Sequence, residues 1–214
     1  MIAKSGRRSR STRRFMTSIP FQQTVFQTSA ATLNQAPADD GLEVAFCGRS
    51  NAGKSSALNR LTQQKRLART SRTPGRTQLI NFFSVSENQR LVDLPGYGYA
   101  KVPQSVKQFW QQHLDAYLRD RRSLVGLILL VDSRHPPKPF DLAMMEWANT
   151  ANLQLHVLLT KADKLSKNQG QQALFKFRQS TRGTLSSQLF SAANGLGLAE
   201  LTDTLERWLT PGEA

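Results

Sequence analysis

The sequence has little cysteine and no long apolar run. Cys47 is the single cysteine among 214 residues, so no disulfide can form within the chain. A reducing compartment such as the cytoplasm is therefore expected. The longest apolar run, Leu124–Val131, is far shorter than the roughly 20 residues that a membrane-spanning helix needs. The 3 histidines show no spacing typical of a metal site.

Acidic residues are also scarce, at 15 against 29 lysines and arginines, and the net charge is +14. Six of the basic residues lie among residues 1–15, which contain no acid, so the rest of the chain carries +8. A chain that stays basic without this segment favours a polyanionic partner. RNA is the expected class, because binding to phosphates releases counterions. The alternative is a generic basic surface.

The first forty residues differ in composition from the rest. Residues 1–15 are rich in Arg and Ser, and we expect a disordered basic tail there. Such a start also resembles an organelle transit peptide, and translation that begins at Met16 is a third interpretation. We therefore divide the chain into the tail, an N-terminal segment at 16–40 and a domain at 41–210.

From Gly41 onward, strand-type and helix-type patterns alternate. Apolar, β-branched runs bounded by turn residues predict strands, and amphipathic periodicity predicts helices. The predicted strands are Leu42–Cys47, Leu79–Ser86, Arg90–Leu94, Leu124–Val131, Leu153–Thr160 and Ser187–Ser191, and the predicted helices are Lys54–Leu61, Pro103–Arg119, Phe140–Asn149, Gln169–Thr181 and Leu198–Leu209. Continuous apolar strands separated by helices indicate a mostly parallel sheet covered on both faces.

The segment Gly48–Ser55 fits the phosphate-binding pattern G-x-x-x-x-G-K-[ST]. It follows a predicted strand and opens a predicted helix, so backbone N–H groups and the helix dipole can face a phosphate. Lys54 can reach the β- and γ-phosphates, and the Ser55 hydroxyl can bind Mg²⁺. A Gly-rich turn is the alternative. The predicted fold class is an α/β P-loop NTPase, with three αβα layers and a mostly parallel six-stranded sheet that has one antiparallel edge strand.

Two further segments indicate a metal ion beside the phosphates. Asp93–Gly96 ends a predicted strand, where the aspartate can hold Mg²⁺ through water and Gly96 can present its N–H to the γ-phosphate. Thr77, in a polar segment before the second predicted strand, can bind Mg²⁺ and the γ-phosphate. Thr73 is the rival, and a plain turn is the alternative for the whole segment.

The last motif indicates the base. Thr160–Asp163 follows a buried predicted strand, and the carboxylate of Asp163 can accept hydrogen bonds from the ring N–H and the exocyclic amine of guanine. Adenine lacks both donors on that edge, so the sequence favours GTP over ATP. The alternative is a helix start with Asp163 as N-cap. A backbone N–H in Ser191–Ala193 can meet the guanine carbonyl.

Together these segments give the candidate site. The nucleotide-binding candidates are Gly48, Arg49, Ser50, Asn51, Ala52, Gly53, Lys54, Ser55, Gly75, Arg76, Thr77, Gln78, Leu79, Asp93, Leu94, Pro95, Gly96, Thr160, Lys161, Ala162, Asp163, Phe190, Ser191 and Ala192. The catalytic candidates among them are Lys54, Thr77 and Gly96, and the candidate Mg²⁺ ligands are Ser55 and Thr77.

Four longer motifs resemble one family. They are GRSNAGKSS at 48–56, TPGRTQLIN at 73–81, DLPGYGYA at 93–100 and DSRHP at 132–136. They resemble the EngB (YihA/YsxC) family within the TrmE-Era-EngA-EngB-Septin-like class of GTPases, over nearly the whole chain. Thr160 stands where most GTPases have asparagine, and the EngB family is similar to this sequence there.

The resemblance implies a bacterial GTPase that associates with the large ribosomal subunit, both rRNA and ribosomal proteins, during its assembly. It also implies a requirement in normal cell division and septation. We expect a cytoplasmic monomer without a membrane span. The alternatives are a nucleotide-binding scaffold that acts directly in septum formation and a metabolic P-loop kinase, against which Asp163 argues.

The resemblance also bears on catalysis. Tyr97 stands where Ras-like enzymes have the glutamine that orients water, so intrinsic hydrolysis is expected to be slow. Asn51 resembles the asparagine of potassium-stimulated GTPases, so K⁺ is a further candidate cofactor, and a hydrogen bond that shapes the loop is the alternative. Tyr97, Tyr99 and Lys101 are expected either to face RNA or protein, or to pack against the predicted helix Pro103–Arg119.

Overall fold

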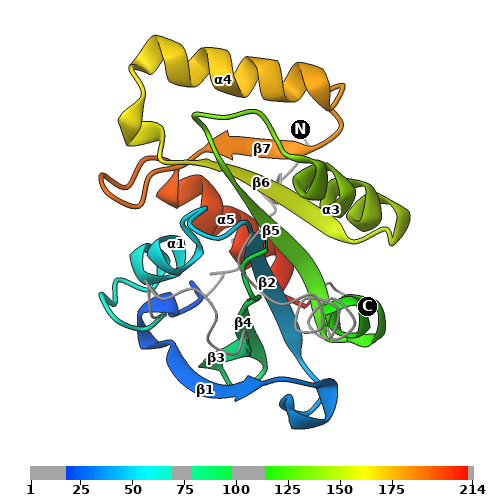
Figure 1. Cartoon of the computed structure of the whole chain (residues 1–214). Coiled ribbons are helices and arrows are strands. Elements are labelled where there is room, and N and C mark those ends of the chain that lie inside the picture. Colours follow the sequence, from blue (N-terminus) through cyan, green and yellow to red (C-terminus); the bar gives the residue numbers. More distant parts are fainter. Residues whose placement is uncertain (1–17, 69–78, 98–113, 212–214) are drawn as a thin grey trace, which may run out of the picture.

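A computed structural model of the chain describes residues 18–68, 79–97 and 114–211 (Figure 1). The described residues form one seven-stranded sheet in the order β1-β3-β4-β2-β5-β6-β7. Its strands are β1 (Val25–Ala30), β2 (Leu42–Gly48), β3 (Ile80–Ser86), β4 (Gln89–Asp93), β5 (Leu124–Asp132), β6 (Gln154–Thr160) and β7 (Ser186–Leu189). The helices are α1 (Lys54–Leu61), α3 (Pro139–Thr150), α4 (Lys167–Ser180) and α5 (Leu198–Leu209), with short 3₁₀ turns η1 (Phe21–Gln23), η2 (Leu33–Gln35) and η3 (Ala162–Lys164).

The sheet is mostly parallel, as predicted. β2 lies at its centre and pairs in parallel with β4 and β5, and β5, β6 and β7 continue the parallel order. β3 is antiparallel to both of its neighbours, β4 and β1. The α/β P-loop class is therefore confirmed, but the sheet has a seventh strand, and the antiparallel strand lies one position inside the edge.

The additional strand is β1, in the N-terminal segment. The sequence does not indicate it, because its six residues, VFQTSA, are half polar and its first three side chains are exposed. Its pairing with β3 supplies the backbone hydrogen bonds that its composition does not predict. The N-terminal segment thus forms part of the same sheet as the P-loop strand.

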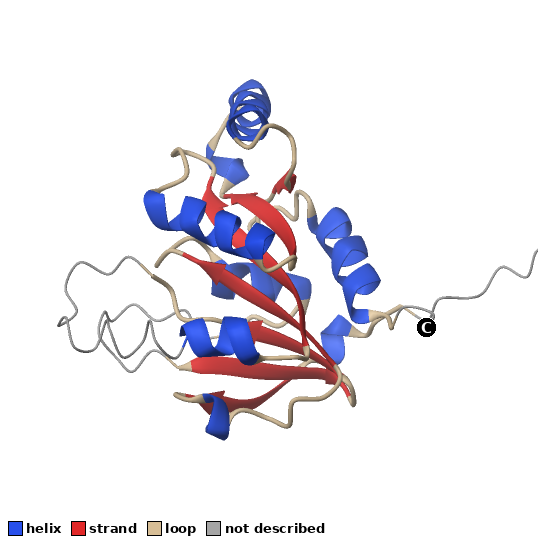
Figure 2. Cartoon of the chain, turned by 90° about the vertical axis from the view of Figure 1, so that its right-hand side faces the viewer, coloured by secondary structure: helices blue, strands red, loops and turns tan. Residues whose placement is uncertain are grey.

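Helices cover both faces of the sheet, which gives the three predicted layers (Figure 2). Side chains of α1 and α5 pack with η1 on one face, where Val44 and Phe46 of β2 point. The other face carries α3, α4 and a helical stretch at 114–120, and it receives Ala45 and Cys47. The alternation along β2 follows from the two-residue period of a strand. Burial raises the pKa of the Cys47 thiol, so Cys47 is a small core side chain, as expected.

No helix within the described ranges combines the length and the hydropathy needed to cross a lipid bilayer.

A buried ionic cluster closes the end of β2 that lies opposite the P-loop. Glu43 is fully buried, and its carboxylate accepts from Arg90 Nε at 2.7 Å and from Arg121 Nη2 at 2.6 Å. Tyr117 Oη donates to the second oxygen of the same carboxylate at 3.1 Å. Both guanidinium groups also donate to the carbonyl oxygen of Ala38. Glu43 therefore pairs with two buried cations, which also pair with Asp40 and Asp39, and the cluster fixes the loop before β2.

The substitution Glu43→Gln should lower the free energy of unfolding by about 3–5 kcal/mol, because it removes the buried carboxylate that both guanidinium groups share and leaves them only the more exposed Asp40 and Asp39. Urea denaturation at pH 7 measures the change. The matched control is Glu87→Gln, an exposed glutamate in the β3–β4 turn, which should change stability by less than about 0.5 kcal/mol. Equal effects of the two substitutions would show that the cluster does not stabilise the fold.

Candidate functional site

The phosphate-binding loop joins β2 to α1, as the sequence predicts. A Cβ on Gly48 would lie 2.7 Å from the carbonyl oxygen of Leu130, so the close approach of β5 requires glycine there. Gly53 has φ +102 and caps α1, a conformation that side chains rarely adopt. Glycine also has no side chain to accept hydrogen bonds from the first turn of α1. The helix N-terminus can therefore offer N–H groups to an anion.

The turn after β4 lies directly against this loop. Ser50 N–H donates to Tyr97 O at 2.8 Å, and Tyr97 N–H donates to Gly48 O at 3.4 Å. A Cβ on Gly96 would lie 2.9 Å from Lys54 Nζ and 3.2 Å from the backbone of Ser50, so a side chain there would crowd this contact. The structure thus brings Lys54 and Gly96, two of the three catalytic candidates, to the same point.

Asp93, the last residue of β4, places a carboxylate beside Lys54. Its Oδ1 is buried and has no hydrogen-bond partner among the described residues. Burial raises the pKa of Asp93 to about 6, and the positive charge of Lys54 opposes this rise. A buried oxygen without a donor, in a phosphate-binding loop, fits a hydrated Mg²⁺ ion, which prefers oxygen ligands.

Other predicted parts of the metal site are less fully described. Ser55 lies in the first turn of α1, where the motif predicts it. Gly75, Arg76, Thr77, Gln78 and the rival Thr73 lie outside the described residues, as do Tyr99, Lys101 and residues 1–15. No group of three or more His, Cys, Asp or Glu side chains suitable for a metal occurs in the described ranges. A metal ion there would depend on hydroxyl, phosphate and water oxygens as well as Asp93.

Thr160 ends β6 and connects the base-reading segment to the P-loop. Its hydroxyl donates to Ala52 O at 2.7 Å, and it is buried. The next residue, Lys161, has φ +59 and forms an ion pair with Asp132 at 2.9 Å. The segment is therefore held to the phosphate-binding loop and to the end of β5.

Asp163 meets the segment that follows β7. Its Oδ1 accepts from Ser191 Oγ at 2.6 Å, and this hydrogen bond lowers the pKa of Asp163. Ala162 N–H donates to Phe190 O at 3.2 Å, and Phe190 is buried. The structure thus places Thr160–Asp163 beside Phe190–Ala192, because β6 and β7 are parallel neighbours that end at the same edge.

Tyr97 does not face a partner. Its hydroxyl donates to Asp141 Oδ1 at 2.6 Å, and its ring stacks on Phe140 with 4.1 Å between ring centroids. Burial and the Asp141 carboxylate both raise the pKa of Tyr97. Tyr97 therefore packs on the start of α3. Residues 103–113 of the predicted helix Pro103–Arg119 lie outside the described residues, so packing of Tyr97 against that helix stays a prediction.

Sequence reasoning missed Asp141. A signal was present: Asp141 is the third residue of α3, and its Oδ2 accepts from Lys138 N–H at 2.8 Å, as an acidic residue at that position often does. That signal predicts a helix start but not the contact with Tyr97.

The strand–loop–helix phosphate site, the buried aspartate beside it and the paired base-reading segments define a P-loop nucleotide-binding protein. The family described as "50S ribosome-binding GTPase" matches residues 43–161, more than half of the chain. The chain belongs to this family and is therefore a GTP-binding protein of the GTPase class.

Solved structures share the fold. A probable GTP-binding protein engB aligns with a TM-score of 0.64 and 20% identity, over 78% of this chain and 98% of that one. Era in complex with MgGDPNP and nucleotides 1506–1542 of 16S ribosomal RNA aligns with a TM-score of 0.59 and 21% identity, over 82% and 59%. The G domain of the T. maritima FeoB iron transporter aligns with a TM-score of 0.50 and 22% identity, over 79% and 99%.

The effect of Asp93→Asn on folding stability should depend on Mg²⁺: the substitution should stabilise the ligand-free protein but weaken the stabilisation that Mg²⁺ and GDP provide. Without ligands, folded Asp93 keeps its proton up to about pH 6, whereas the unfolded chain releases it near 3.8, so stability falls as pH rises between these values and is then level. Asp93→Asn should remove this fall and be more stable than the native protein at pH 7 by roughly 3 kcal/mol. With saturating Mg²⁺ and GDP, the native protein should gain more stability than the variant.

Urea denaturation from pH 4 to 8 measures both effects. Asp115→Asn, a change of the same chemistry at an exposed position, is the control and should keep the native pH profile. If the stability of Asp93→Asn still fell as the pH rose from 4 to 6, a group other than Asp93 would be responsible for the pH dependence.

Proposed function

We propose that this chain is a guanine-nucleotide switch that binds GTP with Mg²⁺, hydrolyses it slowly and acts in assembly of the large ribosomal subunit. The observation that carries the proposal is the Asp163 carboxylate, which Ser191 holds at the edge of the sheet where Thr160 binds the P-loop. One nucleotide can then meet both ends of the site.

The base is read at Asp163 in this proposal. A carboxylate oriented by one hydrogen bond retains lone pairs for the N1–H and the amine of guanine. Ser191 N–H already donates to Leu196 O, so Ala192 N–H is the candidate donor to the guanine carbonyl. The stem of Lys161 covers the face of the base. Adenine would leave the carboxylate without donors, which is costly.

The phosphates occupy the P-loop. Lys54 and the N-terminus of α1 neutralise the β- and γ-phosphates, Ser55 and Thr77 bind Mg²⁺, and Asp93 holds it through water. The N–H of Gly96 meets the γ-phosphate, so GTP and GDP differ at the turn that carries Tyr97. Loss of the γ-phosphate then releases this turn and the segment around Thr77.

Slow hydrolysis follows from Tyr97. Because its hydroxyl is engaged by Asp141 and its ring is stacked on Phe140, it does not orient a water molecule. A partner or an ion must therefore orient the attacking water or stabilise the charge that develops on the phosphates. K⁺ bound by the side chain of Asn51 is one candidate, since a cation between the phosphates offsets the charge that develops there.

The ribosomal role is supported by the description of the family, by the basic composition and by the solved complex of Era with ribosomal RNA. The requirement in cell division and septation rests on the resemblance to the EngB family. We propose that this requirement is a consequence of the role in ribosome assembly. We also propose that the protein acts in the cytoplasm as a monomer.

Asp163→Asn should change the base preference of the protein from guanine to xanthine. An amide presents one acceptor and one donor, which no longer match the two donors of guanine but match the N1–H and the 2-carbonyl of xanthine. We expect GDP affinity to fall at least a hundredfold and XDP affinity to rise, measured by competition against a fluorescent nucleotide. In the native protein, ATP should compete at least a hundredfold more weakly than GTP. Equal binding of ATP and GTP would contradict the assignment.

Single-turnover hydrolysis should be slow, at or below about 0.01 s⁻¹ without a partner. If Asn51 holds K⁺, the rate in KCl should exceed the rate in NaCl several-fold. Asn51→Gly keeps the left-handed backbone at φ +63 but removes the side-chain carbonyl, so it should abolish the difference. Equal rates in the two salts would leave Asn51 with only a role in shaping the loop.

Pull-down on separated ribosomal subunits tests the partner. The GTP-loaded protein should retain large subunits, and the GDP-loaded protein should retain several-fold fewer. Small subunits are the control and should not be enriched. Failure to retain large subunits in either state would favour a direct role in septum formation.

A further inference from the structure

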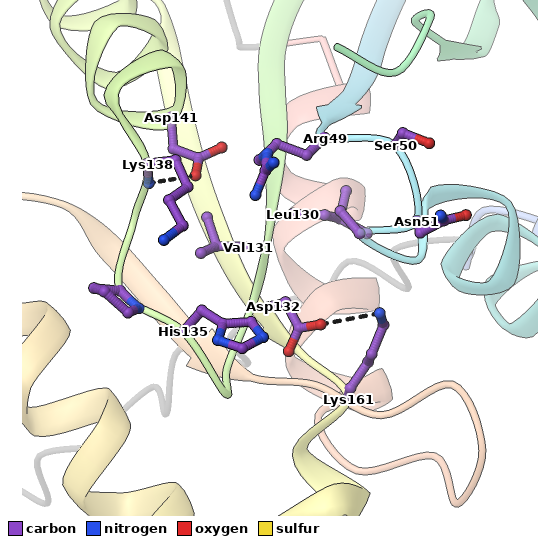
Figure 3. Close-up of a pocket in the computed structure, with 12 residues that line it drawn as sticks. Arg49, Ser50, Asn51, Leu130, Val131, Asp132, His135, Lys138, Asp141 and Lys161 are labelled. Carbon is purple, nitrogen blue, oxygen red and sulfur yellow. Dashed lines mark hydrogen bonds and ion pairs between the residues drawn. The ribbon is translucent and has the colours of Figure 1, made fainter. Parts of the chain in front are cut away.

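A pocket lies on the α3 side of the P-loop (Figure 3). It is lined by Arg49–Ala52 of the P-loop, by the end of β5 and by residues of the loop that leads into α3. Neither Lys54, Asp93 nor Asp163 lines it. Lys161, whose stem is proposed to cover the base, lines it from the far side. The pocket therefore adjoins the nucleotide site and shares residues with it, but the residues proposed to bind the γ-phosphate, Mg²⁺ and the edge of guanine lie outside it.

Cationic side chains from separate elements converge on this pocket. Arg49 reaches into it from the P-loop, and Lys138 and His135 reach into it from the opposite loop (Figure 3). All three residues are exposed to solvent. Arg49 and Lys138 form no ion pair within the described ranges, so their charges are available to an anion.

The two carboxylates of the pocket are already engaged. Asp132 forms ion pairs with Arg134 at 2.7 Å and with Lys161 at 2.9 Å. Asp141 accepts from the Tyr97 hydroxyl and from the backbone N–H of Lys138. The hydrogen bonds to Asp141 come from neutral donors and leave its charge in place. The lining therefore holds three cationic side chains, Arg49, Lys138 and Lys161, against the two carboxylates, and a surplus of one positive charge remains.

We propose that this pocket binds a backbone phosphate of RNA, held by the Arg49 guanidinium and the Lys138 ammonium group; this proposal rests on the ribosomal role proposed above. Guanidinium groups bind phosphate oxygens in pairs, and an ammonium group adds a compact charge. His135 adds a ring N–H donor at the rim. A chain of net charge +14 in a family of 50S ribosome-binding GTPases favours RNA as the source of the phosphate.

The position of Arg49 connects RNA to the nucleotide. Its backbone forms a parallel bridge with Tyr97, and its neighbour Ser50 donates to Tyr97 O. A phosphate drawn to the Arg49 side chain thus contacts the loop against which the turn after β4 is fixed. RNA affinity should therefore differ between the GTP-bound and GDP-bound protein.

Lys138→Gln tests the pocket with little risk to the fold, because α3 is capped by the backbone N–H of Lys138 and the side chain is exposed. Filter binding of the GTP-loaded protein to protein-free RNA from large subunits is measured from 50 to 200 mM KCl. The variant should bind roughly tenfold more weakly, with the slope of log affinity against log salt reduced by about 1. GDP affinity should be unchanged, and Lys138→Arg should restore RNA binding.

Lys176→Gln is the matched control, because it removes one exposed charge from α4, which does not line the pocket. Equal losses for the two variants would overturn the proposal and indicate only diffuse attraction. A native protein that binds intact large subunits, with Lys138→Gln weakened there but not on protein-free RNA, would assign the pocket to a ribosomal protein and also overturn it. If the native protein binds neither large subunits nor their RNA, the proposed ribosomal function fails as well.

Discussion

The hydroxyl of Thr160 links the two halves of the nucleotide site. It donates to Ala52 O, so the residue that opens the base-reading segment also fixes the phosphate-binding loop. Asparagine is usual at this position in GTPases, and here a shorter side chain makes the connection. The distance between the phosphate site and Asp163 is set by this hydrogen bond and by the parallel pairing of β5 with β6. A nucleotide of fixed length can be recognised only if that distance is fixed.

The two ends of the central strands β2 and β4 differ in energy: one end carries a well-paired ionic cluster, and the other carries a buried carboxylate that destabilises the fold. Glu43 and its two arginines close the amino end of β2 with satisfied charges. At the carboxyl end, Asp93 keeps a buried oxygen without a donor, and burial raises its pKa. Such an oxygen destabilises the protein until a metal or water meets it. The stable cluster and the strained site belong to the same pair of strands, β2 and β4.

Local patterns were sufficient to predict most of the fold. The bounds of α1 and α5 are those expected, because clear apolar periodicity and glycine caps mark both helices. β1 was missed because an edge strand need not be apolar on both faces. The P-loop and Asp163 are read from short motifs, but the contact of Tyr97 with Asp141 joins residues 44 positions apart. Only the folded chain shows which aspartate lies nearest to that hydroxyl.

Within the described part of the chain, β1 is an edge strand of the sheet, and its exposed side chains include Val25 and Phe26. An open edge with apolar side chains is the type of surface along which folded chains stack into aggregates. The pairing of β1 with β3 shifts register between Phe26 and Thr28, which interrupts the regular row of backbone groups on the outer side. A regular β1 would present a more continuous template for another strand, so the irregularity makes edge-to-edge pairing at β1 less favourable.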